Sequence, residues 1–449
     1  MVDSVRERTH EVVIVGAGFA GVSAAKELAA HGVDVLLLDK NNYHQFQPLI
    51  YQVATAQLAN RDVARPLRSI FRRDRSVRVT TAEVTRIDPA TRTVTTADGL
   101  TFRGRVLVIA TGAEVNFFGI PGAAEHSFPL YSLDDATRLR SRQLGVLDAA
   151  DRDPRYIEQG ALNVVVVGGG ATGVETAGAV AESMREVVPA YLSKDLAKAG
   201  KVYLVDMLPD ILMPFSERSR KYAAEQLRAA GVEMKLGISV TEVRKDGVVL
   251  KDGSFIPSRT VVWAGGLKAR GLLGDAGLPQ GKGGRIDVAA DLTVPGFEGV
   301  YALGDSANIT DDANGNKLPQ LGAVAMQSGE WAARNILADL RGGQRRPFAY
   351  RDKGIMAMIG RGSAIAELGS KRMHFAGPLA FLAWLGVHVI LLSGVREKIG
   401  ALVSWFWDYG TRRRPQIVVD RPEAYRIDWG AHEEDRSDSA TGARSHASA

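Results

Sequence analysis

The residues with the clearest chemical use in this chain form a glycine triplet near the N-terminus, Gly16-x-Gly18-x-x-Gly21. It follows the short apolar run 12–15 and precedes a helix-like stretch, which predicts a strand, a tight turn and a helix. In such a turn Gly16 permits the bend, Gly18 lets the backbone approach a pyrophosphate, and Gly21 lets the helix pack on the strand. The free N–H groups and partial positive charge of the helix N-terminus then favour phosphate binding.

An acidic residue closes this first unit. Asp39 ends the second apolar strand, 23 residues after Gly16. Its carboxylate can accept hydrogen bonds from ribose hydroxyls, as the acid of a dinucleotide-binding unit does. The combination of strand, triplet, helix and acid therefore predicts a dinucleotide site rather than a simple glycine turn.

The same unit recurs in the middle of the chain, after a run of valines. Its triplet is Gly168-x-Gly170-x-x-Gly173, and the next apolar strand ends at Asp206. This acid follows Gly168 by 38 residues, where about 20 are usual. We therefore expect the stretch 183–200 to lengthen the helix or add a loop, which makes Asp206 the weaker ribose candidate. No arginine follows it directly, which favours NADH over NADPH.

Both units continue in the same way. Asp-Gly turns at Asp98 and Asp252 each stand 12 residues before a set of small residues, Ala110–Gly112 and Ala264–Gly266. Alternating strands around such turns predict a small antiparallel meander in each unit. Two such folds in tandem indicate two different nucleotides bound face to face.

This arrangement resembles the two-dinucleotide-domain flavoprotein reductases, in which the first domain holds FAD and the second NAD(P)H. The stretch "TVPGFEGVYALGD", 293–305, resembles the strand that returns to the FAD domain, and the resemblance implies that Asp305 contacts the ribityl chain. "ATG" at 110–112 resembles the second FAD contact of that superfamily. The chain has no cysteine, which excludes the disulfide and sulfide:quinone reductases that need paired cysteines.

Further stretches resemble type II NADH dehydrogenase, the single-subunit NADH:quinone oxidoreductase. They are "YHQFQPLIYQVATAQL" (43–58), "TGVETAG" with Glu175, "YRDKGIMAMIGRGSAIAEL" (350–368) and the anchor-like "AWLGVHVILLSGVREKIGALVSWFWDY" (383–409). The resemblance covers about residues 10–420. It implies hydride transfer from NADH to FAD, then transfer of two electrons to a membrane quinone, menaquinone or ubiquinone, without proton pumping.

Three residues are the catalytic candidates. The resemblance places Glu175 at the nicotinamide side, where it binds the ribose or relays a proton; the alternative is a first-turn carboxylate favoured by the helix dipole. The family has two glutamines four residues apart near the quinone, whereas this chain keeps Gln327 and has Ala323 four residues before it. Gln320 would share a helical face with Gln327, unless Pro319 leaves it ahead of the helix. This departure leaves the acceptor open.

The remaining site predictions concern cofactor contacts. We expect no metal site, because cysteine is absent and the eight histidines are scattered. The expected contacts with FAD or NADH are Gly16, Gly18, Phe19, Ala20, Gly21, Asp39, Lys40, Gln47, Val84, Ala110, Thr111, Gly112, Gly168, Gly170, Thr172, Gly173, Asp206, Ala264, Gly265, Gly266, Asp305 and Ala323.

The elements that must position these residues predict an α/β fold with two tandem Rossmann-like dinucleotide-binding domains. A region of C-terminal strands and amphipathic membrane-anchoring helices follows them. The predicted divisions are an FAD domain in two parts (8–125 and 291–345), an inserted NADH domain (126–290), C-terminal strands and anchor helices (346–420), and a polar, disordered tail (421–449).

The uncharged stretch 376–395 just reaches the length of about 20 residues that spans a bilayer. Pro378, Gly386 and His388 interrupt it, which favours two short helices lying in one leaflet. Trp384, Trp405 and Trp407 suit the membrane interface, and six basic residues could attract anionic headgroups: Arg372, Arg396, Lys398 and Arg412–Arg414.

The location and partners follow from these features. The charged N-terminus has no apolar core of a signal peptide, so we expect the cytoplasmic face of the inner membrane. The chain has a net charge of +5, but it has no nucleic-acid-binding motif, so we expect no nucleic-acid partner. Family resemblance implies a homodimer through the C-terminal region. The alternatives are a soluble ferredoxin or rubredoxin reductase, an NADH-binding switch with little turnover, and a flavoprotein acting on another lipid-phase substrate.

Overall fold

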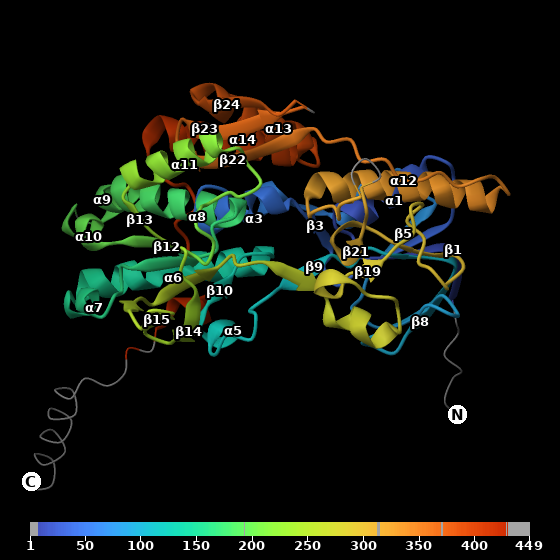
Figure 1. Cartoon of the computed structure of the whole chain (residues 1–449), viewed down its shortest axis with the longest axis horizontal. Coiled ribbons are helices and arrows are strands. Elements are labelled where there is room, and N and C mark those ends of the chain that lie inside the picture. Colours follow the sequence, from blue (N-terminus) through green and yellow to red (C-terminus); the bar gives the residue numbers. More distant parts are fainter. Residues whose placement is uncertain (1–7, 193, 312–314, 370, 428, 430–449) are drawn as a thin grey trace, which may run out of the picture.

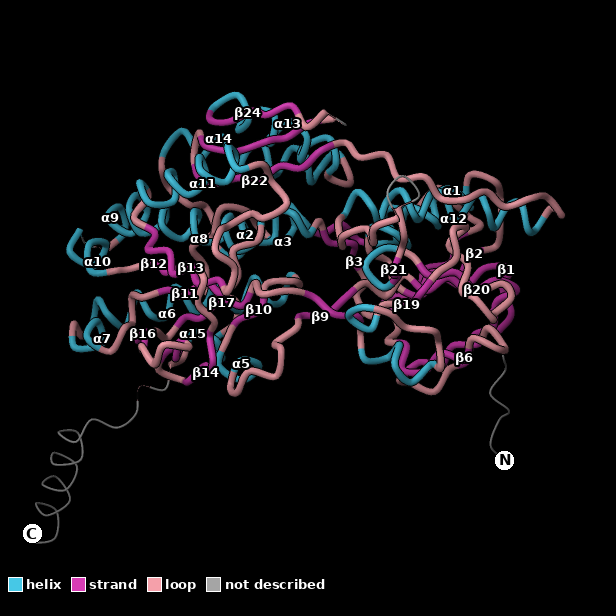
Figure 2. The backbone as a smooth tube through the Cα atoms, in the orientation of Figure 1, coloured by secondary structure: helices cyan, strands magenta, loops and turns pink. Residues whose placement is uncertain are grey.

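The structure is a computed structural model, and it describes residues 8–192, 194–311, 315–369, 371–427 and 429. The elements form two α/β lobes, and a C-terminal layer of strands and helices covers one of them (Figure 1). Strands β9 (Ala113–Val115) and β18 (Leu267–Ala269) pair antiparallel and bridge the two lobes (Figure 2). The two connections between the lobes therefore lie side by side in this ribbon.

The first lobe is built on a sheet with strand order β5-β2-β1-β8-β7-β6, in which β20 also pairs with β8. The strands β5, β2, β1, β8 and β20 are parallel, and their apolar runs are buried because both faces are covered. Strand β7 pairs antiparallel with β6 and β8, which confirms the predicted meander. Helices α1 and α12 pack together on one face (Figure 1). The bounds are β1 Arg8–Val15, α1 Phe19–Ala29, β2 Val35–Asp39, β5 Val77–Thr81, β6 Val84–Asp88, β7 Thr93–Thr96, β8 Thr101–Ile109, β20 Val300–Ala302 and α12 Gly322–Leu340.

The second lobe repeats this design. Its parallel sheet has the order β10-β17-β11-β12-β13, and β14-β15-β16 form the second antiparallel meander. Helix α8 packs on β11 and β12, while α6 packs on β10 and β17. The bounds are β10 Phe128–Pro129, α6 Leu133–Arg152, β11 Val164–Val167, α8 Ala171–Glu182, β12 Val202–Asp206, α11 Glu217–Ala229, β13 Val232–Leu236, β14 Val240–Arg244, β15 Gly247–Leu250, β16 Phe255–Pro257 and β17 Thr260–Trp263.

Of the two alternatives for the extra residues between the second glycine triplet and Asp206, a longer helix or a loop, the structure shows mainly helix. Helix α8 continues into a π-helical turn, η2 (Ser183–Val187), then into α9 (Val188–Tyr191) and α10 (Lys194–Ala199). Pro189 directly follows this π-helical turn and has no N–H to donate to it, so the regular hydrogen-bond pattern of the helix is interrupted there.

The C-terminal layer contains a three-stranded antiparallel sheet and two helices. The strands are β22 (Gly354–Gly360), β23 (Ser363–Leu368) and β24 (Met373–Gly377), and the helices are α13 (Pro378–Leu391) and α14 (Val395–Thr411). Strand β22 packs on α8, and α13 packs on β23. The two predicted helices are present. Among the described residues, none of the helices combines the length and apolar composition that crossing a bilayer requires.

Two segments differ from the predicted divisions of the chain. Leu273, Leu278 and Ile286 pack in the core of the first lobe, although the sequence placed them in the second domain. The predicted tail begins at residue 421, whereas residues 421–427 continue as ordered chain on α6, where Arg421 forms an ion pair with Asp134. Apart from Trp429, the rest of that tail lies outside the described residues.

Short elements complete the connections. They are β3 Tyr43–Gln45, η1 Gln47–Leu49, α2 Ile50–Ala54, α3 Asn60–Val63, β4 Ala64–Pro66, α4 Leu67–Ile70, α5 Ala123–His126, α7 Arg155–Glu158, η3 Gly271–Ala276, η4 Lys282–Gly284, β19 Ile286–Asp287, η5 Gly304–Ser306, β21 Ala307–Asn308 and α15 Pro422–Tyr425.

Candidate functional site

A cavity of about 420 Å³ lies where β1, β2 and β8 of the first lobe end. In parallel α/β sheets ligands bind outside the carboxyl ends of the strands, which is where this cavity is. Twelve residues predicted from the sequence line it: Gly16, Gly18, Phe19, Ala20, Asp39, Lys40, Gln47, Val84, Ala110, Thr111, Gly112 and Asp305.

The first glycine triplet has the geometry that its spacing predicts. Gly16 has a φ of +102°, and a Cβ on it would lie 2.2 Å from the carbonyl oxygen of Ala110. A Cβ on Gly21 would lie 1.9 Å from the carbonyl oxygen of Gly16, because the helix packs directly on the turn. A Cβ on Gly18 would meet nothing within 4 Å. The space in front of Gly18 is therefore open to a ligand that approaches the backbone.

Asp39 is held in place by the turn that it faces. Its Oδ2 accepts a hydrogen bond from the N–H of Ala17 at 2.7 Å, and its Oδ1 accepts one from Asn41 at 2.7 Å. Burial raises the pKa of this carboxyl group, and the two N–H donors partly offset the effect. Each oxygen keeps acceptor capacity for a ribose hydroxyl, because a carboxylate oxygen has two lone pairs.

Asp305 reaches the cavity from η5, just after the end of β20, which pairs with β8. Burial raises its pKa to about 6, while Tyr131 and the nearby Arg285 act in the opposite direction. The Tyr131 hydroxyl lies 3.5 Å from Asp305 Oδ2 and accepts a hydrogen bond from the N–H of Ala113.

Sequence reasoning missed several side chains of this site, among them Tyr131 and Arg270. Tyr131 and Arg270 line the cavity, and Arg270 Nε donates to the Thr111 carbonyl oxygen at 2.8 Å. Both residues come from the segments that enter and leave the second lobe, where no motif marks them. The β9–β18 ribbon that brings those segments to the cavity depends on pairing over a long sequence distance.

The residues of the first cavity fit a dinucleotide. Thr111 lines this cavity beside Gly112, where the backbone of the β8 end is open to a ligand. The open space at Gly18 and the first N–H groups of α1 suit a pyrophosphate.

The glycines of the second triplet have nearly the same close contacts as those of the first. A Cβ on Gly168 would lie 2.4 Å from the carbonyl oxygen of Ala264, and one on Gly173 would lie 1.8 Å from that of Gly168. Gly170 again has open space. Thr172 lies in the first turn of α8, and Gly265 and Gly266 follow Ala264 at the end of β17.

The acid of this unit also takes the same position. Asp206 Oδ2 accepts a hydrogen bond from the N–H of Gly169, and its Oδ1 accepts one from Leu208 at 2.7 Å. The insertion therefore leaves Asp206 in the position that Asp39 takes in the first unit.

Glu175 lies in α8 and contacts the C-terminal layer. Its Oε1 accepts a hydrogen bond from the N–H of Met358 in β22 at 3.1 Å. Burial raises the pKa of this carboxyl group to about 8, and the Met358 N–H and the Trp384 indole oppose that shift only partly. At neutral pH Glu175 therefore carries a proton, unlike an exposed first-turn carboxylate.

The structure does not bring the glutamine candidates together. Gln320 precedes α12, which begins at Gly322, so the shared helical face with Gln327 does not form. Gln320 Nε2 instead donates to the carbonyl oxygen of Asp305 at 3.1 Å, beside the cavity. Gln327 exchanges two hydrogen bonds with the backbone of Arg351. Neither Gln327 nor Ala323 lines the cavity, although Gly322 and Ala325 of the same helix do.

The C-terminal helices present an apolar surface, but two of the three tryptophans predicted to lie at the membrane interface point inward. Trp384 and Trp405 are buried, and the Trp405 indole donates to Gln52 Oε1 at 2.7 Å. Trp407 is exposed. Some tryptophans are buried and others exposed because each helix packs one face on the lobes and exposes the opposite face.

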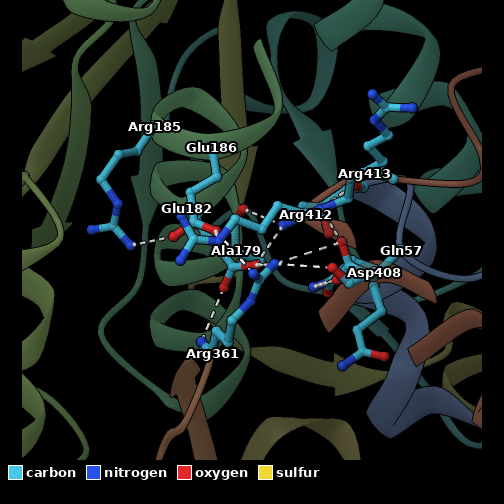
Figure 3. A network of polar contacts seen from close by, with 12 residues as sticks. Gln57, Ala179, Glu182, Arg185, Glu186, Arg361, Asp408, Arg412 and Arg413 are labelled. Atoms are coloured by element: carbon cyan, nitrogen blue, oxygen red, sulfur yellow. Dashed lines mark hydrogen bonds and ion pairs between the residues drawn. The ribbon is translucent and has the colours of Figure 1, made fainter. Parts of the chain in front are cut away.

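Arg414, predicted to meet lipid headgroups, is instead buried. Its guanidinium forms ion pairs with Glu182 at 3.5 Å and Asp408 at 3.6 Å. Arg361 joins Glu182 to the same network, and Gln57 donates to Asp408 (Figure 3). These contacts tie the end of α14 to α8. A buried guanidinium needs such partners, which explains why this arginine turned inward.

Comparisons with known proteins agree with this geometry. The family model described as pyridine nucleotide-disulphide oxidoreductase matches residues 10–329. The chain is 36% identical to the type II NADH:quinone oxidoreductase Ndh of Mycobacterium tuberculosis, over 93% of this chain and 92% of that protein. It is 29% identical to the type II NADH:quinone oxidoreductase of Staphylococcus saprophyticus, over 78% of this chain and 87% of that protein.

A solved structure shows the same fold at lower identity. NDH2 from Plasmodium falciparum in complex with NADH superimposes with a TM-score of 0.83 and 18% identity, covering 92% of this chain and all of that one. With two nucleotide turns, a matching family model over most of its length and relatives of this identity, the chain belongs to the pyridine nucleotide-disulphide oxidoreductases and, within them, to the type II NADH:quinone oxidoreductases, enzymes that use FAD to pass electrons from NADH to a quinone.

Proposed function

We propose that the first cavity holds FAD and the second glycine turn holds NADH, with named roles for the residues that form them. The turn at Gly16–Gly21 receives the FAD pyrophosphate, Asp39 the ribose, and Asp305 the ribityl chain. Gly168–Gly173 and Asp206 take the corresponding roles for NADH. The match between the two acids, each bonded to the N–H of the residue after the first glycine, supports this assignment.

Bound FAD supplies the redox chemistry, by accepting a hydride from NADH and passing two electrons on to the quinone. A quinol carries two hydrogens more than the quinone. The hydride from NADH accounts for one of them, so one further proton must be supplied for each quinone reduced. Glu175 is the group that we assign to this task. It holds a proton at neutral pH, and it lies where α8 meets β22 of the C-terminal layer.

We also propose that α13 and α14 lie on a lipid surface, from which a membrane quinone enters. The observation that carries this proposal is a broad exposed apolar face: the side chain of Phe406 is 82% exposed and that of Ile390 is 72% exposed. The same face includes Leu379, Leu382, Val395, Ile399, Leu402, Val403 and Trp407. Exposed apolar surface of this extent marks an interaction site, and Arg396 beside it is free to meet anionic headgroups.

The homodimer and the absence of proton pumping stay predictions, as does the cytoplasmic side of the membrane, which was inferred from the N-terminal residues; the kind of quinone stays open. They are not needed for the assignment of the two nucleotide sites. The central experiment is NADH oxidation by the flavin-loaded enzyme, measured with a lipid-soluble quinone in vesicles and with a short-chain quinone in solution. If neither assay shows NADH oxidation, the proposal is contradicted.

Replacing Ile390, Val403 and Phe406 together by serine is expected to release the enzyme from vesicles. Each large apolar side chain contributes about 1.5–3 kcal/mol when it leaves water, so the triple variant should bind at least about a thousandfold more weakly. Co-sedimentation with vesicles measures the loss. Turnover with a short-chain quinone should persist, since the substitutions lie outside both nucleotide sites.

A single serine at Leu100 serves as the control for that experiment. Leu100 is an exposed apolar residue at the β7–β8 turn of the first lobe, away from α13 and α14. Its replacement should leave sedimentation unchanged. Undiminished vesicle binding by the triple variant would show that the face does not dock on lipid.

Replacing Asp206 by asparagine is expected to weaken the preference for NADH over NADPH. The carboxylate repels a 2′-phosphate and accepts hydrogen bonds from the 2′-hydroxyl, while asparagine keeps the acceptor oxygen for the Gly169 N–H without the charge. We expect the ratio of kcat/KM values for the two cofactors to fall about tenfold, which corresponds to about 1.4 kcal/mol. Steady-state kinetics with each cofactor measure it.

The matched control for that variant is Glu233→Gln. Glu233 lies in β13, beside the strand that carries Asp206, and pairs at its surface with Lys201. Glu233→Gln should leave the ratio of kcat/KM values for NADH and NADPH unchanged. If wild type and Asp206→Asn had the same ratio of kcat/KM values for NADH and NADPH, Asp206 would not contact the ribose.

A further inference from the structure

The segment that leaves the second lobe carries a cation into the cavity of the first. Arg270 directly follows β18 and lines that cavity together with Gly271 and Leu272. Its side chain is partly buried, and its Nε donates to the carbonyl oxygen of Thr111 at 2.8 Å. Its two terminal nitrogens have no hydrogen-bond partner among the described residues, and neither is closed off from the surface. Both are therefore available to a ligand in the cavity.

The neighbours of Arg270 place its guanidinium at the level of the first glycine turn. Thr111, which accepts from Nε, lies directly against that turn, because a Cβ on Gly16 would lie 3.1 Å from the Cα of Thr111. Burial raises the pKa of Asp39 and that of Tyr131, and the nearby charge of Arg270 acts against both shifts. Arg270 therefore lies between the parts of the cavity that we assign to the ribose and to the ribityl chain.

The charges that line this cavity are mostly negative. Among the described residues the cations that line it are Lys40, which is exposed, and Arg270, which is partly buried. The acids that line it are Asp39, Glu83, Glu114 and Asp305. A pyrophosphate would add two negative charges to this environment, and the first N–H groups of α1 offer only a partial positive charge. A full positive charge facing the phosphates offsets that repulsion.

We propose that Arg270 binds the pyrophosphate of FAD, across the cavity from the N–H groups of the first glycine turn. An arginine suits this task because its planar guanidinium presents several N–H donors to phosphate oxygens, and the bond from Nε to Thr111 fixes its orientation. This inference rests on the assignment of FAD to the first cavity. Its consequence is that a residue delivered by the second lobe completes the FAD site of the first.

Arg270→Gln tests this role in the full chain. Glutamine keeps an N–H donor for the carbonyl oxygen of Thr111 but carries no charge. Equilibrium dialysis should give a dissociation constant for FAD at least about tenfold higher than that of wild type, the loss expected when a hydrogen bond to a charged group is removed. Arg270→Lys keeps the charge as a phosphate-binding ammonium group, so its dissociation constant should stay within about threefold of wild type.

Two further measurements separate a phosphate contact from a purely structural role. Riboflavin lacks the pyrophosphate, so wild type and Arg270→Gln should bind it with dissociation constants within about threefold of each other. Raising the salt concentration from about 0.1 M to about 1 M shortens the Debye length from about 10 Å to about 3 Å. The affinity of wild type for FAD should then fall at least about threefold more than that of Arg270→Gln, because only wild type has this charge to screen.

Arg244→Gln is the matched control. Arg244 is an exposed arginine at the end of β14 in the second lobe, where it forms an ion pair with Glu242, and it does not line the cavity. The substitution removes the same unit of charge from the chain, so it should leave the dissociation constant for FAD and its salt dependence unchanged. The unfolding temperature of each apoprotein, expected within about 2 °C of wild type, shows that the variants have folded.

The outcomes distinguish this role of Arg270 from the assignment of FAD itself. If wild type bound no FAD, that assignment would fail and the role of Arg270 with it. If wild type bound FAD and Arg270→Gln bound it equally tightly, only the role of Arg270 would be wrong. An equal loss of affinity for riboflavin and FAD would place Arg270 against the flavin ring or the ribityl chain. An equal loss in Arg270→Gln and Arg270→Lys would show that its charge does not hold the cofactor.

Discussion

Replacing Gly21 by alanine is expected to give a colourless protein that is destabilised before any FAD binds. The added Cβ would lie 1.9 Å from the carbonyl oxygen of Gly16, and a clash with backbone cannot be relieved by rotating a side chain. Overpacking of this kind costs about 3 kcal/mol. Thermal unfolding of the apoprotein and the visible flavin absorbance of the purified protein measure both effects.

The neighbouring substitution Gly18→Ala should separate binding from folding. A Cβ at Gly18 has no protein atom within 4 Å, so the apoprotein should unfold at the same temperature as wild type, to within about 2 °C. The same Cβ would stand in the space that we assign to the pyrophosphate, so FAD should bind at least about tenfold more weakly.

A third alanine variant controls for the loss of a glycine as such. Gly410 is exposed near the end of α14 and also has open space, so Gly410→Ala should change neither the unfolding temperature nor the flavin content. If Gly18→Ala bound FAD as tightly as wild type, the pyrophosphate would not lie against that turn. If Gly21→Ala were as stable as wild type, the packing argument would be wrong.

Replacing Glu175 by glutamine is expected to lower turnover with quinone about a hundredfold at neutral pH, the usual contribution of a positioned acid or base. In the wild type the pKa of about 8 means that the carboxyl group is protonated below that pH and loses its proton above it. Turnover of the wild type should therefore fall as the pH rises through about 8. The variant cannot titrate, so this decline should be absent from its pH profile.

The stability of the two proteins should diverge with pH in a direction set by the same carboxyl group. In the unfolded chain Glu175 ionises near its ordinary pKa of 4.5, whereas in the folded protein it ionises near 8. The folded state binds the extra proton between these values, so wild-type stability falls as the pH rises from about 4.5 to about 8. Glu175→Gln should lack that part of the decline.

Glu225→Gln is the control, because Glu225 is exposed on α11. It should leave both profiles as in the wild type. A full alkaline decline of turnover in Glu175→Gln would assign the titrating group to another residue. Unchanged turnover together with the altered stability profile would leave Glu175 with a structural role alone.

The sequence by itself determined the two nucleotide turns and their acids. Gly21 packs on Gly16, and Asp39 accepts the N–H of Ala17, so these contacts form within one strand, one turn, one helix and the strand that follows. Spacing therefore predicts their geometry, and the second unit repeats it despite its insertion. The two meanders and the paired C-terminal helices were predictable for the same reason, since local alternation and apolar runs specify them.

The tertiary structure alone decided which side chains complete the site and which face the helices turn outward. Tyr131 and Arg270 reach the cavity of the first lobe only because β9 pairs with β18 across the lobes. Gln327 turns to the backbone of Arg351, and Arg414 turns inward to Glu182, because buried polar groups must find partners that lie far away in the sequence. Apolar composition showed that α13 and α14 exist, but packing on the lobes determined that Trp384 is buried while other apolar side chains remain exposed.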